Sequence, residues 1–177
     1  MRASILKWEL GGIAIIFLSG SVLHFVFDWV GGWPPAALIA AVNESVWEHL
    51  KLAFWPGLIF ALIEFFFLKA KTKNFWVAKT CALFTMPAII VAVFYGYTAL
   101  LGRHILWLDI ALFGLAVVAG QMISFALMIR EPFGTKTRIA VGAVLALMIA
   151  AFSLFSYLPP RCPLFQDSLT GQYGIMK

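Results

Sequence analysis

The sequence predicts an all-α, polytopic membrane helix bundle with about five transmembrane helices plus an outer amphipathic or re-entrant helix. Hydrophobic residues make up 63% of the 177 residues and charged residues only 12%, and the mean hydropathy is +0.95. This composition excludes a water-soluble globular protein. Because each crossing needs about 20 apolar residues, no length remains for a separate soluble domain. We therefore expect residues 1–177 to form a single integral membrane domain.

The first crossing is expected over about residues 8–27. Turn-forming residues 31–35 follow it, and an apolar stretch then continues to residue 68. As one helix this stretch would be about 50 Å long, whereas the hydrocarbon core is only about 30 Å thick. We therefore expect Pro56 to separate an outer amphipathic helix over about 35–55 from the second crossing.

Three further crossings are expected in the second half of the chain, over about 75–101, 105–129 and 139–157. The tail, residues 159–177, contains adjacent prolines and has too little apolar length to span. We expect it to form a structured cap that folds back over the outer end of the bundle, with Asp167 capping a backbone segment or pairing with a basic group such as Arg103.

The distribution of basic residues predicts the orientation. If the N-terminus is cytoplasmic, nine of the thirteen Lys and Arg residues lie on the cytoplasmic side, and only Lys51, Arg103, Arg161 and Lys177 lie outside. The positive-inside rule then places the C-terminus outside the cell. The net charge of +5 is explained by this topology, so we expect membrane lipids as partners and no nucleic acid.

The same topology gathers all three histidines and most of the acidic residues in the outer half of the molecule. Ionisable groups at membrane depth are costly unless they are paired or hydrated, so such a gathering is a candidate functional site. His24 and Asp28 are four residues apart and would share a helix face, which suits an aspartate that orients a histidine. An interfacial hydrogen bond without function is the alternative for this pair.

The densest polar motif is residues 42–51, with the sequence VNESVWEHLK. On a continuous helix Glu44 and Glu48 would be neighbours and would repel each other if both were ionised. We expect His24, Glu44 and Glu48 to converge within roughly 3 to 5 Å, as catalytic groups or as ligands of a divalent metal such as zinc, with Asp28 as a fourth catalytic candidate. His49 would point about 100° away from Glu48 and fits this set poorly. The substrate-binding candidates are Asn43, Trp47, Lys51, Arg103 and His104. An ordinary interfacial amphipathic helix is the alternative for the whole motif.

Two stretches together carry a resemblance to a known family: the motif VNESVWEHLK, preceded by HFVFDW at 24–29, and the tail segment PLFQD with GQYGI at 163–175. They resemble an uncharacterised family of small bacterial multipass membrane proteins, a domain of unknown function. The resemblance covers nearly the whole chain and implies the bacterial plasma (inner) membrane. It implies no activity.

The residues leave several functions open. One is a metal-assisted or acid/base enzyme that acts on a lipid or lipid-linked substrate at the extracytoplasmic face. Another is a non-enzymatic accessory protein that binds a lipid or a protein partner. A small transporter is less favoured because no internal repeat is visible. Heme ligation would need facing histidines on separate helices.

Overall fold

The computed structural model describes residues 1–175 and is built from helices. Its five α-helices are α1 (Arg2–Trp29), α2 (Val46–Leu68), α3 (Phe75–Leu101), α4 (Leu106–Met128) and α5 (Thr135–Leu154), with two short 3-10 helices, η1 (Pro34–Leu38) and η2 (Pro163–Phe165). The described residues form no β-strand. All five α-helices are long and apolar enough to cross a membrane. The predicted all-α membrane bundle is therefore confirmed.

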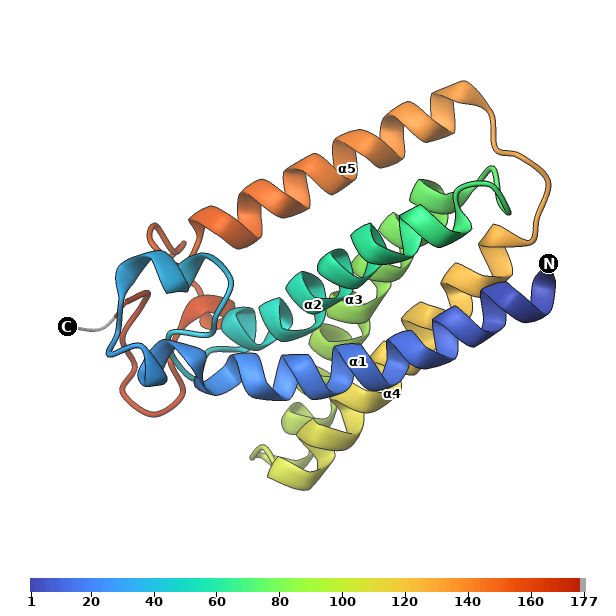
Figure 1. Cartoon of the computed structure of the whole chain (residues 1–177). Helices are drawn as coiled ribbons and strands as arrows, with labels where there is room; N and C mark the ends of the chain where they lie inside the picture. Colours follow the sequence, from blue (N-terminus) through green and yellow to red (C-terminus); the bar gives the residue numbers. More distant parts are fainter. Residues whose placement is uncertain (176–177) are drawn as a thin grey trace.

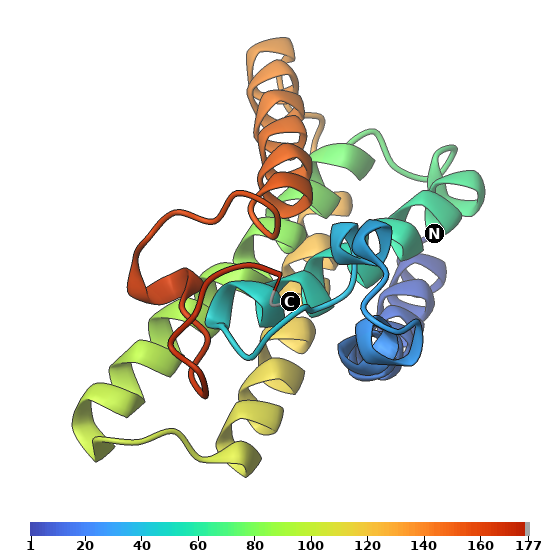
Figure 2. The ribbon, with the colours of Figure 1, turned by 90° about the vertical axis from the view of Figure 1, so that its left-hand side faces the viewer.

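The five α-helices form a bundle (Figure 1). α1 packs against α2 and α4, and α3 packs against α4, α2 and α5. The N-terminus lies at one end of the bundle, and the loop before α2 lies with the C-terminal tail at the other (Figure 1). We call these the far end and the tail end. Figure 2 looks onto the tail end, where the tail lies over the start of α2.

α1 approaches α2 closely at a glycine. A Cβ atom at Gly20 would lie 2.4 Å from the carbonyl oxygen of Leu52. That carbonyl lacks its usual helical partner, because Pro56, four residues later, has no N–H to donate. Gly20 thus allows α1 to cover the backbone oxygen that Pro56 leaves free, a packing mode typical of membrane helices.

The expected outer helix over 35–55 is not formed, and Pro56 does not separate two pieces. Instead η1 ends at Leu38, residues 39–45 form a loop, and α2 runs without interruption through Pro56. Ser45 fixes the start of α2, since its hydroxyl accepts a hydrogen bond from the Glu48 amide at 3.3 Å and serves as N-cap. The amphipathic pattern therefore belongs partly to a loop and partly to the first turns of a crossing helix.

A buried charged cluster joins four helices inside the bundle. Lys79 of α3 donates to both carboxylate oxygens of Glu9 at 2.8 and 2.9 Å and forms an ion pair with Glu64 of α2. The α4 residues Gln121 and Ser124 also bond Glu9. Such groups are stable in a membrane bundle only when they satisfy one another. Glu64 and Gln121 therefore have a structural role in the bundle.

Candidate functional site

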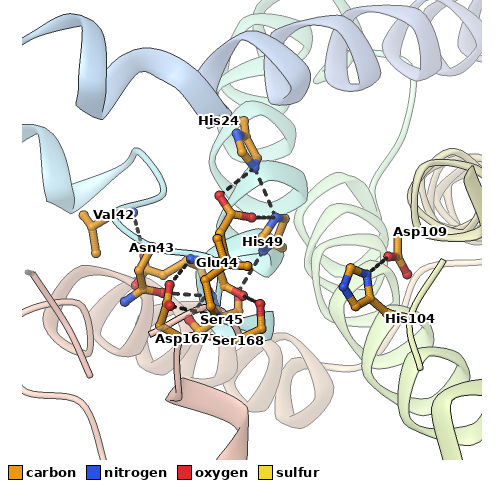
Figure 3. Close-up of polar contacts among 12 residues, drawn as sticks. His24, Val42, Asn43, Glu44, Ser45, His49, His104, Asp109, Asp167 and Ser168 are labelled. Atoms are coloured by element: carbon orange, nitrogen blue, oxygen red, sulfur yellow. Dashed lines mark hydrogen bonds and ion pairs between the residues drawn. The ribbon is translucent and has the colours of Figure 1, made fainter. Parts of the chain in front are cut away.

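Three side chains with metal-ligand chemistry converge at the tail end. His24 lies on α1, Glu44 lies in the loop before α2, and His49 lies in the first turn of α2 (Figure 3). The Nε2 atoms of the two histidines are 3.2 Å apart. One Glu44 oxygen lies 3.6 Å from His24 Nε2, and the other lies 3.4 Å from His49 Nε2. One donor atom from each side chain lies within 4.8 Å of the other two, close enough for the three to hold one metal ion.

These separations fit a tetrahedral metal ion. Two ligand bonds of about 2.0 to 2.1 Å at the tetrahedral angle place the donor atoms about 3.3 Å apart. The observed distances of 3.2, 3.4 and 3.6 Å surround this value, and the two distances to Glu44 are long for hydrogen bonds to a carboxylate. Two histidines and one carboxylate would leave a fourth position open.

The backbone orients His49. Its Nδ1 lies 2.8 Å from the carbonyl oxygen of Ser45. A carbonyl only accepts, so Nδ1 carries the proton, and in the neutral ring Nε2 keeps its lone pair toward His24 and Glu44. Metal-binding histidines are commonly fixed in this way. Nδ1 of His24 is buried and has no hydrogen-bond partner among the described residues.

The tail holds Glu44 in place. Its backbone amide donates to Asp167 Oδ2 at 2.7 Å, and its carbonyl accepts from the Ser168 hydroxyl at 3.1 Å. The contacts of the Glu44 carboxylate with His24 and then His49 hold its pKa well below the usual value, because a ring N–H, or the positive charge of a protonated imidazole, favours the ionised carboxylate. Glu44 is therefore a fixed carboxylate at neutral pH.

The cluster opens onto a cavity of about 790 Å³. Its walls are mostly apolar side chains of α1, α3 and α4, among them Phe17, Phe94 and Phe113, and tail residues 163–171 contribute to its edge. A cavity of this size with a few polar groups at one place is typical of sites for small amphipathic molecules.

A second polar group lines the same cavity. His104 Nδ1 lies 3.2 Å from Asp109 Oδ2, and the Tyr97 hydroxyl donates a hydrogen bond to the other oxygen of Asp109. Figure 3 shows this pair apart from the cluster of His24, Glu44 and His49. An imidazole oriented by a carboxylate can accept or donate a proton. His104 therefore lines the cavity, and its role in substrate binding stays a prediction.

Glu48 does not join His24, contrary to the expected ligand set. It is buried in an ion pair with Lys51 at 2.7 Å, and the Ser156 hydroxyl donates to its other oxygen at 2.7 Å. The Val42 amide also donates to it, at 3.1 Å. Because the helix starts only at Val46, Glu44 and Glu48 do not share a helical face. Glu48 and Lys51 therefore form a structural cluster, and Lys51 does not reach the cavity as an anion clamp.

Asp28 does not orient His24. Its side chain is exposed in the last turn of α1, and it makes no polar contact with His24 in the described part of the chain. Arg103 is also exposed. The Asp167 carboxylate accepts hydrogen bonds from the backbone amides of Glu44, Leu169 and Thr170. Asp167 is therefore the expected cap of a backbone segment and not a partner of Arg103.

Two expected binding residues instead attach the tail. Asn43 donates to the carbonyl of Gly174 at 2.9 Å and accepts from the Ser45 amide. Trp47 stacks on Phe152 and lies against Phe165, with ring centroids 4.6 and 4.7 Å away. These contacts confirm that the tail folds back over the polar loop. They give Asn43 and Trp47 a packing role rather than a place in the cavity wall.

Comparison with known proteins gives a family. Neither a curated protein nor a solved structure matches the chain. A family model does match residues 1–175, and it is described as a family of unknown function (DUF6512). The match spans all the helices, the loop that supplies Glu44 and the folded-back tail. The chain therefore belongs to this family of unknown function, DUF6512.

Proposed function

We propose that the protein binds one divalent transition metal, with zinc as the first candidate, through His24, Glu44 and His49. We further propose that this site acts on a lipid or lipid-linked substrate in the adjoining cavity. The observation that supports the proposal best is the convergence of His24, Glu44 and His49 beside an apolar cavity, with pairwise contacts of 3.2 to 3.6 Å between their donor atoms. Mixed imidazole and carboxylate ligation suits zinc and similar ions.

The residues divide the chemistry between them. A metal held by these three ligands would act as a Lewis acid toward a substrate oxygen or a water at its fourth position. The phenylalanines of the cavity would hold the apolar part of the substrate and exclude bulk water. His104, oriented by Asp109, would exchange the proton that a hydrolysis or transfer reaction requires. The two Nε2 atoms, 3.2 Å apart, suit neighbouring positions on one ion and not the two opposite faces of a heme.

The metal is tested first, because it needs no substrate. The purified protein, stripped of metal and titrated with Zn²⁺, should bind one equivalent. His49→Ala and Glu44→Gln should each weaken binding by more than about 100-fold, since even outer partners of a ligand contribute 10- to 100-fold. His104→Ala and Asp28→Asn are matched controls and should bind as the natural chain does. Equal binding by a His24→Ala/His49→Ala variant would refute the site.

A non-enzymatic lipid-binding protein is the second candidate. It is favoured by the apolar character of the cavity, which would hold an acyl chain without any metal. Mass spectrometry of the protein with its bound lipids distinguishes the two. An enzyme should release a changed lipid when metal is added, whereas a binding protein should return the same lipid.

We also propose that the tail end is extracytoplasmic and the N-terminus cytoplasmic, in the plasma membrane. The support is the basic asymmetry of the sequence and the position of the N-terminus and the described part of the tail at opposite ends of five apolar helices. Cys162 of the tail is a free, partly exposed cysteine, so an impermeant thiol reagent should label it in intact cells. If Cys162 is labelled only after the cells are opened, the tail end is cytoplasmic and the proposed orientation is wrong.

A further inference from the structure

A second cavity lies at the far end of the bundle, where α5 separates from its neighbours. Its volume is about 420 Å³, and residues of α2, α3, α5 and the loop between α2 and α3 line it. α5 buries little of its own surface, and among its residues only Phe152, near its tail-end terminus, is fully buried. The half of α5 at the far end lies apart from the other helices (Figure 1), and the cavity is lined there by residues of α2, α3 and α5.

The mouth of this cavity is strongly basic. Lys69 and Lys73 of the loop between α2 and α3 line it together with Arg138 of α5, whereas no acidic residue does. Lys69 lies over the rings of Phe65 and Phe66, with its Nζ 5.7 and 5.8 Å from their centroids. Within residues 1–175, none of the three cations has a carboxylate partner. Three uncompensated cations at one opening favour an anionic group.

Apart from the three cations and two threonines, Thr72 and Thr80, the cavity lining is apolar. Trp76, Val141 and Leu145 form part of its wall, and tryptophan at a helix end is typical of the membrane interface. Thr80 also lines the cavity and is 2% exposed. Its hydroxyl has no hydrogen-bond partner in the described part of the chain. A ligand here would meet cations at the mouth and mostly hydrocarbon deeper inside.

We propose that this cleft binds one anionic phospholipid. The phosphate lies between Lys69, Lys73 and Arg138, and an acyl chain fills the gap against Val141 and Leu145. Basic pockets between transmembrane helices bind acidic headgroups in this way. The bilayer supplies such a molecule directly, and its two-part chemistry matches both the mouth and the wall. The lipid would attach α5 to the bundle at the end where protein contacts are few.

The test uses the full chain in detergent with dioleoyl phosphatidylglycerol as probe and dioleoyl phosphatidylcholine as the neutral comparison. Phosphatidylglycerol should bind at one site and raise the thermal midpoint, and phosphatidylcholine should not. The variant Lys69→Gln/Lys73→Gln/Arg138→Gln should lose roughly 100-fold in affinity, about a factor of five for each basic residue. The matched control Arg2→Gln/Lys7→Gln/Lys136→Gln removes three charges that do not line the cavity and should retain binding.

A second variant tests the acyl-chain part. Gly142 lines the cavity, and a Cβ added to it meets no atom within 4 Å, so Gly142→Phe introduces a ring at the cavity wall with no clash at its Cβ. It should weaken phosphatidylglycerol binding although every charge remains, while Gly96→Phe, also in open space, should not. The proposal would be overturned if the triple charge variant and its matched triple control lost phosphatidylglycerol affinity equally. Displacement of the lipid by millimolar inorganic phosphate would also overturn it.

Discussion

Replacing Lys51 by methionine should destabilise the fold severely. The Lys51 ammonium lies 2.7 Å from Glu48 Oε2, and it donates to the Ala37 carbonyl and to the Ser156 hydroxyl, both at 2.7 Å. Lys51 is 0% exposed and Glu48 is 2% exposed. Methionine fills a similar volume but leaves the Glu48 carboxylate buried without its counter-charge.

The cost follows from that unpaired charge. Removing one partner of a buried ion pair typically costs about 3 to 5 kcal/mol. For a chain of this size each kcal/mol lowers the thermal midpoint by about 2 to 4 °C, so we expect a decrease of roughly 6 to 20 °C. The double variant Glu48→Gln/Lys51→Met removes both charges and should recover part of the loss, because a neutral pair has no uncompensated charge to bury.

Thermal unfolding in detergent, followed by tryptophan fluorescence, measures both effects. Lys136→Met is the control, since Lys136 is exposed and such changes usually stay within about 0.5 kcal/mol. If Lys51→Met unfolds at the temperature of this control, the ion pair contributes nothing to stability. If the double variant is no more stable than Lys51→Met, the unpaired charge is not the cause of the loss.

Two further changes test the tail and the contact between α1 and α2. Burial opposes ionisation of Asp167, but amide donors, first that of Glu44, outweigh it and lower its pKa. This contribution to stability is present above the unfolded pKa of about 3.9 and is lost as the pH falls through the folded pKa. Asp167→Asn should therefore increase thiol labelling of Cys162 at neutral pH and abolish the dependence of that labelling on acid pH. Unchanged labelling would contradict this reasoning. Gly20→Ala places a Cβ 2.4 Å from the Leu52 oxygen and should lower stability by about 1 to 3 kcal/mol in thermal unfolding, whereas Gly11→Ala, with nothing within 4 Å, should not; equal midpoints would show that α1 can move away.

The crossings could be predicted because a membrane-spanning helix requires a long apolar run in the sequence. The expected spans over 75–101 and 105–129 agree closely with α3 and α4. The first crossing is longer than predicted, since α1 begins at Arg2 and includes the basic residues before the apolar run. Hydropathy marks the part of a helix inside hydrocarbon, and a helix can continue into the interface where its polar side chains meet water and headgroups.

The prediction for the polar motif is wrong because the motif contains a helix start, and helical periodicity does not extend to the loop residues before Val46. Ser45 and Glu48 have the spacing of a capping box, serine followed three residues later by glutamate, which predicts a helix beginning at residue 46. The structure shows the serine half of this motif, while the Glu48 side chain reaches back to the Val42 amide. With the start placed there, Glu44 lies in the loop and is free to turn toward His24.

The same helix start explains why His49, and not Glu48, completes the cluster. The two residues are adjacent, so their side chains leave α2 about 100° apart, and only one of them can point at the cavity. Glu48 turns inward to Lys51, and His49 turns outward to Glu44. Each choice depends on a contact distant in sequence: Ser156 for Glu48 and His24 of α1 for His49. Hydrophobic periodicity carries no information about such partners, so the buried ion pair and the candidate metal site could be separated only in three dimensions.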